Sequence, residues 1–215
     1  MKISPIQYIS SGANSEEHFQ HIQKALRQGV DWVQLRLKDS NTTEKVSLAR
    51  RILALKEQYT FTFIINDDVE AVAQTDADGV HLGLNDMPIA DAKKILHAEK
   101  IIGGTANTLS DVLQRINEGC NYIGLGPLRH TNTKQELSPI LGFAGYASIM
   151  KTIDPALAPP IVAIGAVEDC DIPRLKEIGL YGIALSKHIQ DNFSNPQHIA
   201  HLNNLIHEHE IKHRR

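Results

Sequence analysis

The sequence predicts a single (β/α)₈ barrel over residues 1–215, and three observations lead to this fold class. Eight short apolar runs alternate with amphipathic segments, a pattern typical of parallel strands joined by helices. The runs are nearly continuous in apolar residues, so both faces of the sheet should be buried. A length of 215 residues lies at the lower end of the usual barrel size. An open, doubly wound sheet remains an alternative, because strands counted from a sequence do not show whether the sheet closes.

Each expected strand is an apolar run bounded by Gly, Asp or Asn. In chain order the strands are expected at Pro5–Ile9, Asp31–Leu37, Phe61–Asn66, Gly79–Leu82, Lys100–Gly103, Tyr122–Gly126, Pro160–Ile164 and Tyr181–Leu185. Helices are expected between them at Ser15–Gln28, Thr43–Gln58, Pro88–His97, Leu109–Glu118, Gly145–Ile153, Asp171–Ile178 and Pro196–His207. The Val69–Gln74 link has room for only one or two turns. No linker or charge block divides the chain, which predicts one domain.

Composition argues against several classes of protein. The net charge of −3 and the lack of a basic stripe disfavour nucleic acid as a partner. Two cysteines, Cys120 and Cys170, form no C-x-x-C pattern and no disulfide framework, which favours a reduced, cytoplasmic compartment. No signal peptide and no long apolar membrane segment is recognisable. The histidines of the C-terminal HEHEIKHRR match no zinc motif and are interpreted as a solvated helix end. A homo-oligomer remains open.

Basic and polar side chains alternate at the end of the second expected strand. Gln34, Arg36 and Lys38 fall on one side of an extended segment. In a barrel, residues at strand ends gather at one mouth, where arginine and lysine suit a phosphate or diphosphate. An exposed strand end with ordinary salt bridges is the alternative.

Carboxylates follow the third and fourth expected strands. Asp67 comes directly after Asn66, and Asp86 lies in the loop after His81 and Leu82. Oxygen ligands from two neighbouring strands, without a His/Cys cluster, favour Mg²⁺. The alternative is that they serve as turn and helix-cap residues, which are commonly Asp. His81 itself is interpreted as a hydrogen-bonded structural residue rather than a catalytic base.

Anion-binding features are also expected after the last three strands. Gly126 is followed by a polar stretch with Thr131, Thr133 and Lys134, which is interpreted as a loop that closes over an anion. Gly165 and Ser186 follow the seventh and eighth strands, where barrels commonly bind phosphate through backbone N–H groups.

Taken in order, seven motifs resemble those of the thiamine phosphate synthase family: VQLRLKD, IIND, ADGVHLGLND, IIGGTANT, NYIGLGPLRHTNTK, PIVAIGAV and GIALS. The resemblance covers most of the chain. It implies a Mg²⁺-dependent (β/α)₈ barrel that joins hydroxymethylpyrimidine diphosphate to thiazole phosphate, releasing diphosphate and forming thiamine phosphate.

The resemblance also implies roles for individual residues. Asp67 and Asp86 would hold Mg²⁺, Gly165 and Ser186 would hold the thiazole phosphate, and Thr131 and Thr133 would belong to the closing loop. The pyrimidine diphosphate would be bound by Gln34, Arg36, Lys38, Asn66, Thr105 and Lys134. Lys38, Lys134 and Thr105 would be the catalytic residues of this set, since stabilising the departing diphosphate is the main catalytic task.

The sequence departs from the family pattern mainly on the thiazole side. Ala166 stands where a second glycine is usual, Leu128-Arg129-His130 differ in the loop, and Ser186 is shifted by about one position. In the fourth-strand loop, Leu84-Asn85 replace a common Gln-Glu. Two other functions are therefore kept: a thiazole tautomerase, which needs neither the carboxylate pair nor the TxTK loop, and a non-catalytic barrel that binds thiazole phosphate or thiamine phosphate.

Overall fold

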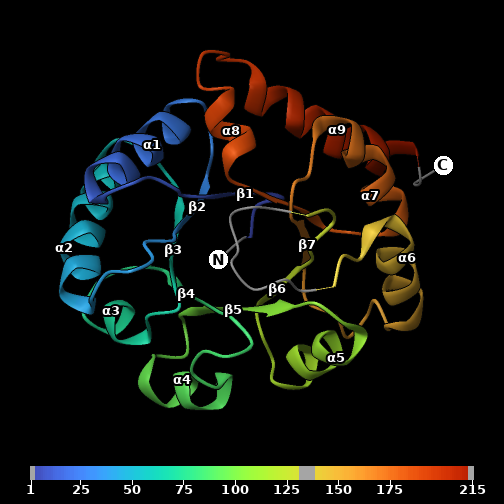
Figure 1. The fold of residues 1–215 in the computed structure, drawn as a ribbon, viewed down its shortest axis with the longest axis horizontal. Helices are drawn as coiled ribbons and strands as arrows, with labels where there is room; N and C mark the ends of the chain where they lie inside the picture. Colours follow the sequence, from blue (N-terminus) through green and yellow to red (C-terminus); the bar gives the residue numbers. More distant parts are fainter. Residues whose placement is uncertain (1–2, 131–138, 213–215) are drawn as a thin grey trace.

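The computed structural model describes residues 3–130 and 139–212, with side chains described through Glu208. Eight parallel strands form a closed barrel in sequence order, and helices surround it (Figure 1). Closure is made by the pairing of the first and last strands, in which Ile6 faces Ile183. The predicted (β/α)₈ barrel is thus confirmed, and the open sheet is excluded.

The strands and helices lie close to the predicted segments. The strands are β1 Ile6–Ile9, β2 Trp32–Leu35, β3 Thr62–Asn66, β4 Gly79–Leu82, β5 Ile101–Ala106, β6 Tyr122–Leu125, β7 Ile161–Ile164 and β8 Gly182–Leu185. The helices are α1 Ser15–Arg27, α2 Thr42–Leu53, α3 Val69–Ala73, α4 Ile89–Ile95, α5 Leu109–Asn117, α6 Gly142–Thr152, α7 Ile172–Ile178, α8 Lys187–Asp191 and α9 His198–Lys212. Short 3₁₀ turns, η1 Ala54–Glu57 and η2 Asp169–Asp171, complete the list.

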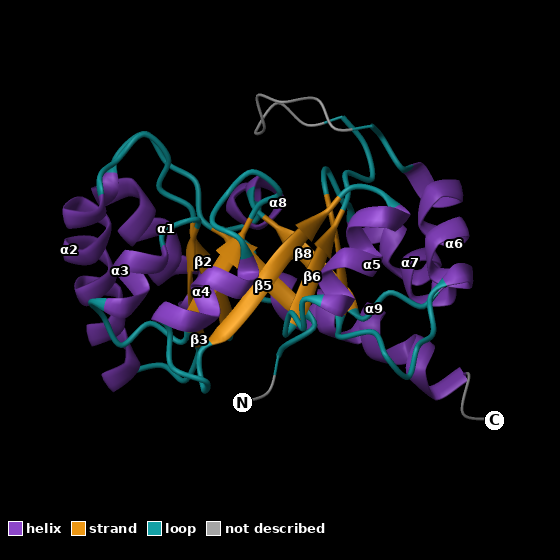
Figure 2. Ribbon diagram, turned by 90° about the horizontal axis from the view of Figure 1, so that it is seen from below, coloured by secondary structure: helices purple, strands orange, loops and turns teal. Residues whose placement is uncertain are grey.

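Two differences from the predicted elements affect the mouth of the barrel. Strand β5 continues three residues beyond the predicted Gly103, so Thr105 lies within the strand. The short helix α8 follows β8 directly and was not predicted, because five residues are too few to show a helical period. Both elements carry polar residues at the carboxyl ends of the strands. Figure 2 shows the barrel from the side.

Local sequence explains where the longer helices begin. Asn14 and Asn41 accept hydrogen bonds from the backbone N–H groups of Glu17 and Glu44, so each asparagine caps a helix. At α5, Thr108 and Asp111 form a reciprocal capping box. These caps satisfy N–H groups that would otherwise lack partners at the first turn.

The core has two layers that meet at the strands. The layer between barrel and helices is built from apolar residues of the strands and of the helices packed on them, most of them aliphatic. The barrel interior is filled by a smaller set: Ile9, Trp32, Ile64, Ile101, Tyr122, Val162 and Ala184. Gly103 gives Tyr122 its place, because a Cβ on Gly103 would overlap the Tyr122 ring. These side chains fill the barrel interior below the mouth, which lies at the carboxyl ends of the strands. Among the described residues, no helix is long and apolar enough to cross a membrane.

Candidate active site

A cavity of about 400 Å³ opens at the carboxyl ends of the strands. Residues from every strand end line it, and predicted site residues are prominent among them: Gln34, Arg36, Asn66, Thr105, Gly165 and Ser186. Lys38, Asp67 and Asp86 are not part of the lining. A pocket of this volume, apolar with a few converging polar groups, is suited to a small-molecule ligand.

The two predicted carboxylates lie together beside this cavity. Asp67 follows β3 with φ of 65°, and its backbone N–H donates to the His81 carbonyl at 2.8 Å. Asp86 accepts a hydrogen bond from the Gly83 N–H at 2.5 Å. Pro88, and not Asp86, occupies the cap position of α4, so the helix-cap alternative for Asp86 is wrong. The strained backbone at Asp67 directs its side chain toward Asp86.

Electrostatics at this pair are those of a cation site. Burial, helped by the hydrogen bond and the charge of Asp86, raises the pKa of Asp67 to about 7, although the charges of Arg36 and Lys45 oppose the shift. Two carboxylates in contact cannot both ionise at little cost unless positive charge is supplied. A divalent cation with oxygen ligands would supply it, and Mg²⁺ prefers one or two carboxylates completed by phosphate oxygens and water. The residues present therefore fit Mg²⁺.

The neighbouring Asp68 has a different role. One oxygen accepts from the Ala71 N–H at 2.9 Å and caps α3, while the other binds Lys45 at 3.2 Å and Thr42 at 3.0 Å. Burial raises the pKa of Asp68, but these hydrogen bonds outweigh it and leave the pKa below its usual value. Its carboxylate is therefore already satisfied by the protein, and Asp67 is the residue available to a metal.

The basic residues after β2 differ in exposure. Arg36 is half-buried and lines the cavity, where burial lowers its pKa and the charge of Asp67 opposes that shift. Lys38 lies in the following turn and is exposed. Gln34 is buried within β2, and its Nε2 makes no hydrogen bond of good geometry, although the amide is near enough to the Tyr122 hydroxyl to oppose the rise of the tyrosine pKa. A buried amide donor without a partner costs about 1–3 kcal/mol unless a ligand accepts its hydrogen bond. This favours Gln34 as a substrate contact.

A chain of polar side chains crosses the cavity floor. His81 contacts the Tyr122 hydroxyl through Nδ1 and the Thr105 hydroxyl through Nε2, each at 3.0 Å. Gln7 donates to the same tyrosine hydroxyl at 3.2 Å. Both ring nitrogens of His81 are engaged, in agreement with the interpretation of this histidine as structural. Thr105 lies near the carboxyl end of β5, and its side chain lines the cavity.

The opposite side of the mouth is shaped by backbone. Gly165 has φ of 98°, and a Cβ there would approach Pro127 to 2.5 Å, so only glycine fits. Ala166 follows with φ of 48°, in the left-handed region that glycine favours. The Gly165 carbonyl accepts a hydrogen bond from the Arg129 N–H at 3.1 Å. Ser186, beyond β8, bonds the Ser11 hydroxyl at 3.2 Å.

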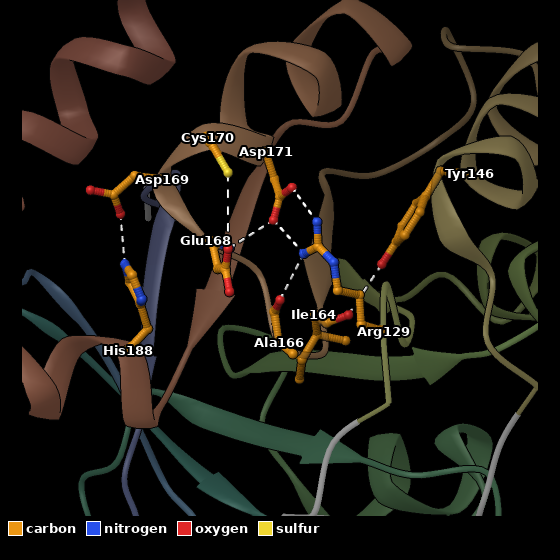
Figure 3. A network of polar contacts seen from close by, with 9 residues as sticks. All are labelled: Arg129, Tyr146, Ile164, Ala166, Glu168, Asp169, Cys170, Asp171 and His188. Carbon is orange, nitrogen blue, oxygen red and sulfur yellow. Dashed lines mark hydrogen bonds and ion pairs between the residues drawn. The ribbon is translucent and has the colours of Figure 1, made fainter.

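An ion pair that was not predicted fixes this backbone (Figure 3). Arg129 donates two hydrogen bonds of 2.6 Å to Asp171 and a third, of 3.0 Å, to the Ala166 carbonyl. Burial raises the pKa of Asp171, but the bonds from Arg129 and the Glu168 N–H outweigh burial and lower it. Arg129 was noted in the sequence only as a departure from a family pattern. Its distance of 42 residues from Asp171 gave no signal of the contact.

Other residues of the site were missed, or lie outside the described part. Ser11, Asn107, Lys187 and His188 also line the cavity, and their positions directly after β1, β5 and β8 were the available signal. Thr131, Thr133 and Lys134 lie outside the described residues, so their predicted role in a closing loop stays a prediction.

Comparison with known proteins gives consistent matches. Residues 6–189 match the family model described as thiamine monophosphate synthase. The chain is 48% identical to a thiamine-phosphate synthase of Flavobacterium psychrophilum, over 94% of this chain and 98% of the relative. It is 46% identical to that of Flavobacterium johnsoniae, over 94% and 95%. A solved thiamine phosphate pyrophosphorylase from Pyrococcus furiosus matches with a TM-score of 0.81, 25% identity and coverage of 95% and 96%.

Proposed function

The chain belongs to the thiamine monophosphate synthase family, and we propose that its barrel mouth joins a pyrimidine to a thiazole. The enzyme is a transferase that takes 4-amino-2-methyl-5-hydroxymethylpyrimidine diphosphate and thiazole phosphate and gives thiamine phosphate and diphosphate. The observation that supports this most is the acidic pair beside Arg36: Asp67 and Asp86 share a hydrogen bond next to a basic side chain that lines the cavity. As part of the same proposal, the enzyme works in the cytoplasm, with neither nucleic acid nor membrane as a partner.

The reaction needs charge stabilisation and positioning more than proton transfer. The bond between the pyrimidine methylene carbon and the diphosphate oxygen breaks, and its electron pair leaves with diphosphate. The thiazole nitrogen donates its lone pair to that carbon, so no proton has to move at the forming bond. This agrees with the hydrogen-bonded state of His81, which is not free to act as a base.

Charged residues on the side of β2 to β4 are proposed to stabilise the leaving group. Asp67 and Asp86 would hold Mg²⁺, which when bound neutralises charge on the diphosphate. Arg36 and Lys38 would bind the diphosphate oxygens, joined by Lys134 from outside the described residues. Arginine suits this position because its planar fork can bind two phosphate oxygens at once.

Buried amides and hydroxyls are proposed to orient the pyrimidine. Gln34 offers an Nε2–H that makes no hydrogen bond of good geometry within the protein, and Asn66 also lines the cavity. Thr105 is held by His81 and presents its hydroxyl at the cavity floor. Holding both reactants in line contributes up to about 7–11 kcal/mol in favourable reactions. Positioning is thus the second main contribution of this chain.

Gly165 and Ser186 are proposed to bind the thiazole phosphate through the backbone after β7 and β8. The left-handed conformation of Gly165 and Ala166 lets the chain turn sharply at the cavity wall. A thiazole tautomerase would leave the acidic pair without a purpose, so the transferase is favoured over that alternative.

One incubation tests the activity. The full chain is mixed with both substrates and Mg²⁺, and thiamine phosphate and diphosphate are measured. Formation of both in equal amounts, abolished by a chelator of divalent cations, is the expected result. Binding of pyrimidine diphosphate by calorimetry, dependent on Mg²⁺ but with no product formed, would instead support a non-catalytic binding barrel.

A further inference from the structure

A cluster of histidines and one carboxylate lies at the edge of the mouth, in the segments that follow β7 and β8. Asp169 starts the turn η2, His188 lies in α8, and His198 begins α9. One oxygen of Asp169 and one ring nitrogen from each of the two histidines all lie within 4.8 Å of one another. His201, one helical turn after His198, places its Nε2 3.4 Å from the other Asp169 oxygen. Three segments far apart in sequence thus converge on one carboxylate.

One histidine of this cluster has a buried ring nitrogen that is left unsatisfied. His198 is 3% exposed, and its buried Nε2 has no hydrogen-bond partner. Buried polar nitrogens are nearly always satisfied, so one left without a partner calls for a ligand. The His188 ring lies 5.2 Å from the His198 ring at an angle of 56°, which is not a stacked arrangement. The site is therefore polar and incomplete as the protein alone builds it.

Protonation does not complete the site. The Nε2 of His188 lies 2.6 Å from an Asp169 oxygen, which one shared proton explains. Burial lowers the pKa of His198, Asp169 opposes the shift, and His188 and His201 add to it. A neutral imidazole keeps a lone pair, and this is the form in which histidine binds metals. The charged groups that face the cluster are thus Asp169, the neighbouring imidazoles and the more distant Asp171, whose charge interacts with His188.

We propose that Asp169, His188 and His198 form a binding site for a divalent metal ion of the zinc class, with His201 as the fourth ligand. Imidazole nitrogens with a single carboxylate are typical ligands of Zn²⁺, whereas Mg²⁺ prefers oxygen ligands throughout. Ligand atoms of a tetrahedral zinc site are about 3.3 Å apart. The ligand atoms of Asp169, His188 and His198 lie within 4.8 Å of one another, so small side-chain rotations reach that geometry. His201, whose Nε2 lies 3.4 Å from an Asp169 oxygen, would rotate to complete it. The proposal is independent of the transferase activity proposed above.

The site would connect parts of the barrel mouth. Figure 3 shows Asp171 bound to Arg129, in the segment after β6, and Asp169 bound to His188, in α8. His188 also lines the cavity. A metal bound here would fasten the start of α9 to the segments after β7 and β8. Its role is thus structural, in stiffening the wall next to Gly165 and Ser186.

Zinc titration of the metal-stripped full chain tests the proposal. Competition with a chromophoric chelator should give one tight site per chain, and Co²⁺ should show the visible absorption of tetrahedral coordination. Asp169→Asn and His198→Asn should each weaken the tight site by at least about 100-fold, beyond the 10–100-fold typical of outer-shell changes. Saturating Zn²⁺ should raise the melting temperature by about 5–10 °C in the parent chain but not in these two variants.

Matched controls separate this site from other ligands in the chain. His97→Ala removes an exposed histidine on α4's side of the barrel, and Asp67→Asn removes the acidic pair. A triple variant, with His207, His209 and His213 changed to Ala, removes the C-terminal histidines. All three should keep the tight site. His201→Ala, an exposed change, tests the cluster if His198→Asn does not fold.

Two results would overturn the proposal. One is the absence of a stoichiometric Zn²⁺ site in the parent chain. The other is a tight site that survives Asp169→Asn and His201→Ala but is lost in the triple C-terminal variant. Neither result depends on turnover, so failure of this proposal and failure of the transferase activity are distinguishable.

Discussion

The two sides of the barrel mouth are built from different materials. The side at the ends of β2 to β4 presents charged side chains: Arg36, Asp67 and Asp86. The side at the ends of β6 to β8 presents backbone in unusual conformations at Gly165 and Ala166, fixed by the Arg129–Asp171 pair. The function of the first side therefore depends on its charged groups, whereas the shape of the second side depends on the backbone angles that its residues can adopt.

This contrast predicts different responses to substitution. A change on the charged side should alter chemistry and leave the fold intact or more stable. A change on the backbone side should mainly alter the stability of the chain. It should affect the binding of thiazole phosphate only as a consequence of that change. Four variants test whether the two sides differ in this way, and they are given in order of decreasing expected effect.

Asp67→Asn should have the largest effect on turnover. Loss of one metal ligand removes charge stabilisation of the diphosphate, and we expect kcat to fall about 100–1,000-fold, as for other removed transition-state contacts. The metal-free variant should be more stable than the parent at pH 8, by about 1 kcal/mol, because two carboxylates no longer repel. Steady-state kinetics and denaturant unfolding with and without Mg²⁺ measure both effects.

Asp68→Asn is the matched control for that experiment. It changes an adjacent carboxylate that caps α3 and binds Lys45, so it should cost about 1 kcal/mol of stability and leave kcat near the parent value. Equal turnover in the parent and Asp67→Asn would remove Asp67 from the proposed metal site. Asp86→Asn should reproduce the Asp67→Asn result, since the two carboxylates act on one ion.

Gly165→Ala should have the largest effect on stability. At φ of 98° a side chain is strained, and the new Cβ would meet Pro127. We expect a loss of about 2–4 kcal/mol, which combines backbone strain with overpacking. Gly29→Ala is the control, because Gly29 has a similar φ of 94° with nothing within 4 Å of an added Cβ. It should lose only about 1–2 kcal/mol. Equal losses in urea unfolding would show that the contact with Pro127 is unimportant.

Arg129→Met should destabilise the chain by about 1–2 kcal/mol, because it leaves the buried Asp171 carboxylate without its partner while solvent at the half-exposed arginine moderates the cost. The pKa of Asp171 is lowered in the folded state, so the stabilisation is present above its usual value of 3.8 and disappears as the pH falls through the folded value. The parent and the variant should therefore differ most near pH 7 and converge below about pH 4.

Unfolding measured across this pH range, with Lys187→Met as control, checks the sign. Lys187 pairs with Asp191 at a site where both side chains are exposed, so its removal should change stability by less than about 0.5 kcal/mol at any pH. A difference between the parent and Arg129→Met that stays constant down to pH 3 would assign the effect to packing on Phe143 and not to the ion pair.

How much the sequence predicted follows the same division. Apolar runs predicted the barrel and its strand order, and the positions of Asp67 and Asp86 after neighbouring strands predicted that they would meet, because parallel strands end at one edge. The length of β5 and the existence of α8 were not predictable, since short extensions carry no period. Contacts such as Arg129–Asp171 and the convergence of His188 and His198 on Asp169 were not predicted, because the sequence shows which strand ends are neighbours but not how the loops after them fold or where their side chains point.

At Ala166 the sequence and the structure together identify a strained residue. The sequence shows an alanine where a second glycine is usual. The structure adds a cost within the backbone, because Ala166 has φ of 48° and its carbonyl is held by Arg129. The residue thus keeps a glycine-like conformation without being glycine.

Ala166→Gly should have the smallest effect, and an unusual sign. Relief of the left-handed strain gains about 1–2 kcal/mol. The greater freedom of glycine in the unfolded chain costs about 0.5–1 kcal/mol, which leaves a net stabilisation near 0.5 kcal/mol. Ala98→Gly, at an exposed turn with negative φ, is the control and should destabilise by about 0.5 kcal/mol. The KM for thiazole phosphate should be unchanged or lower. A large rise in this KM would place the phosphate elsewhere on the rim, and the proposed role of the backbone after β7 would be wrong.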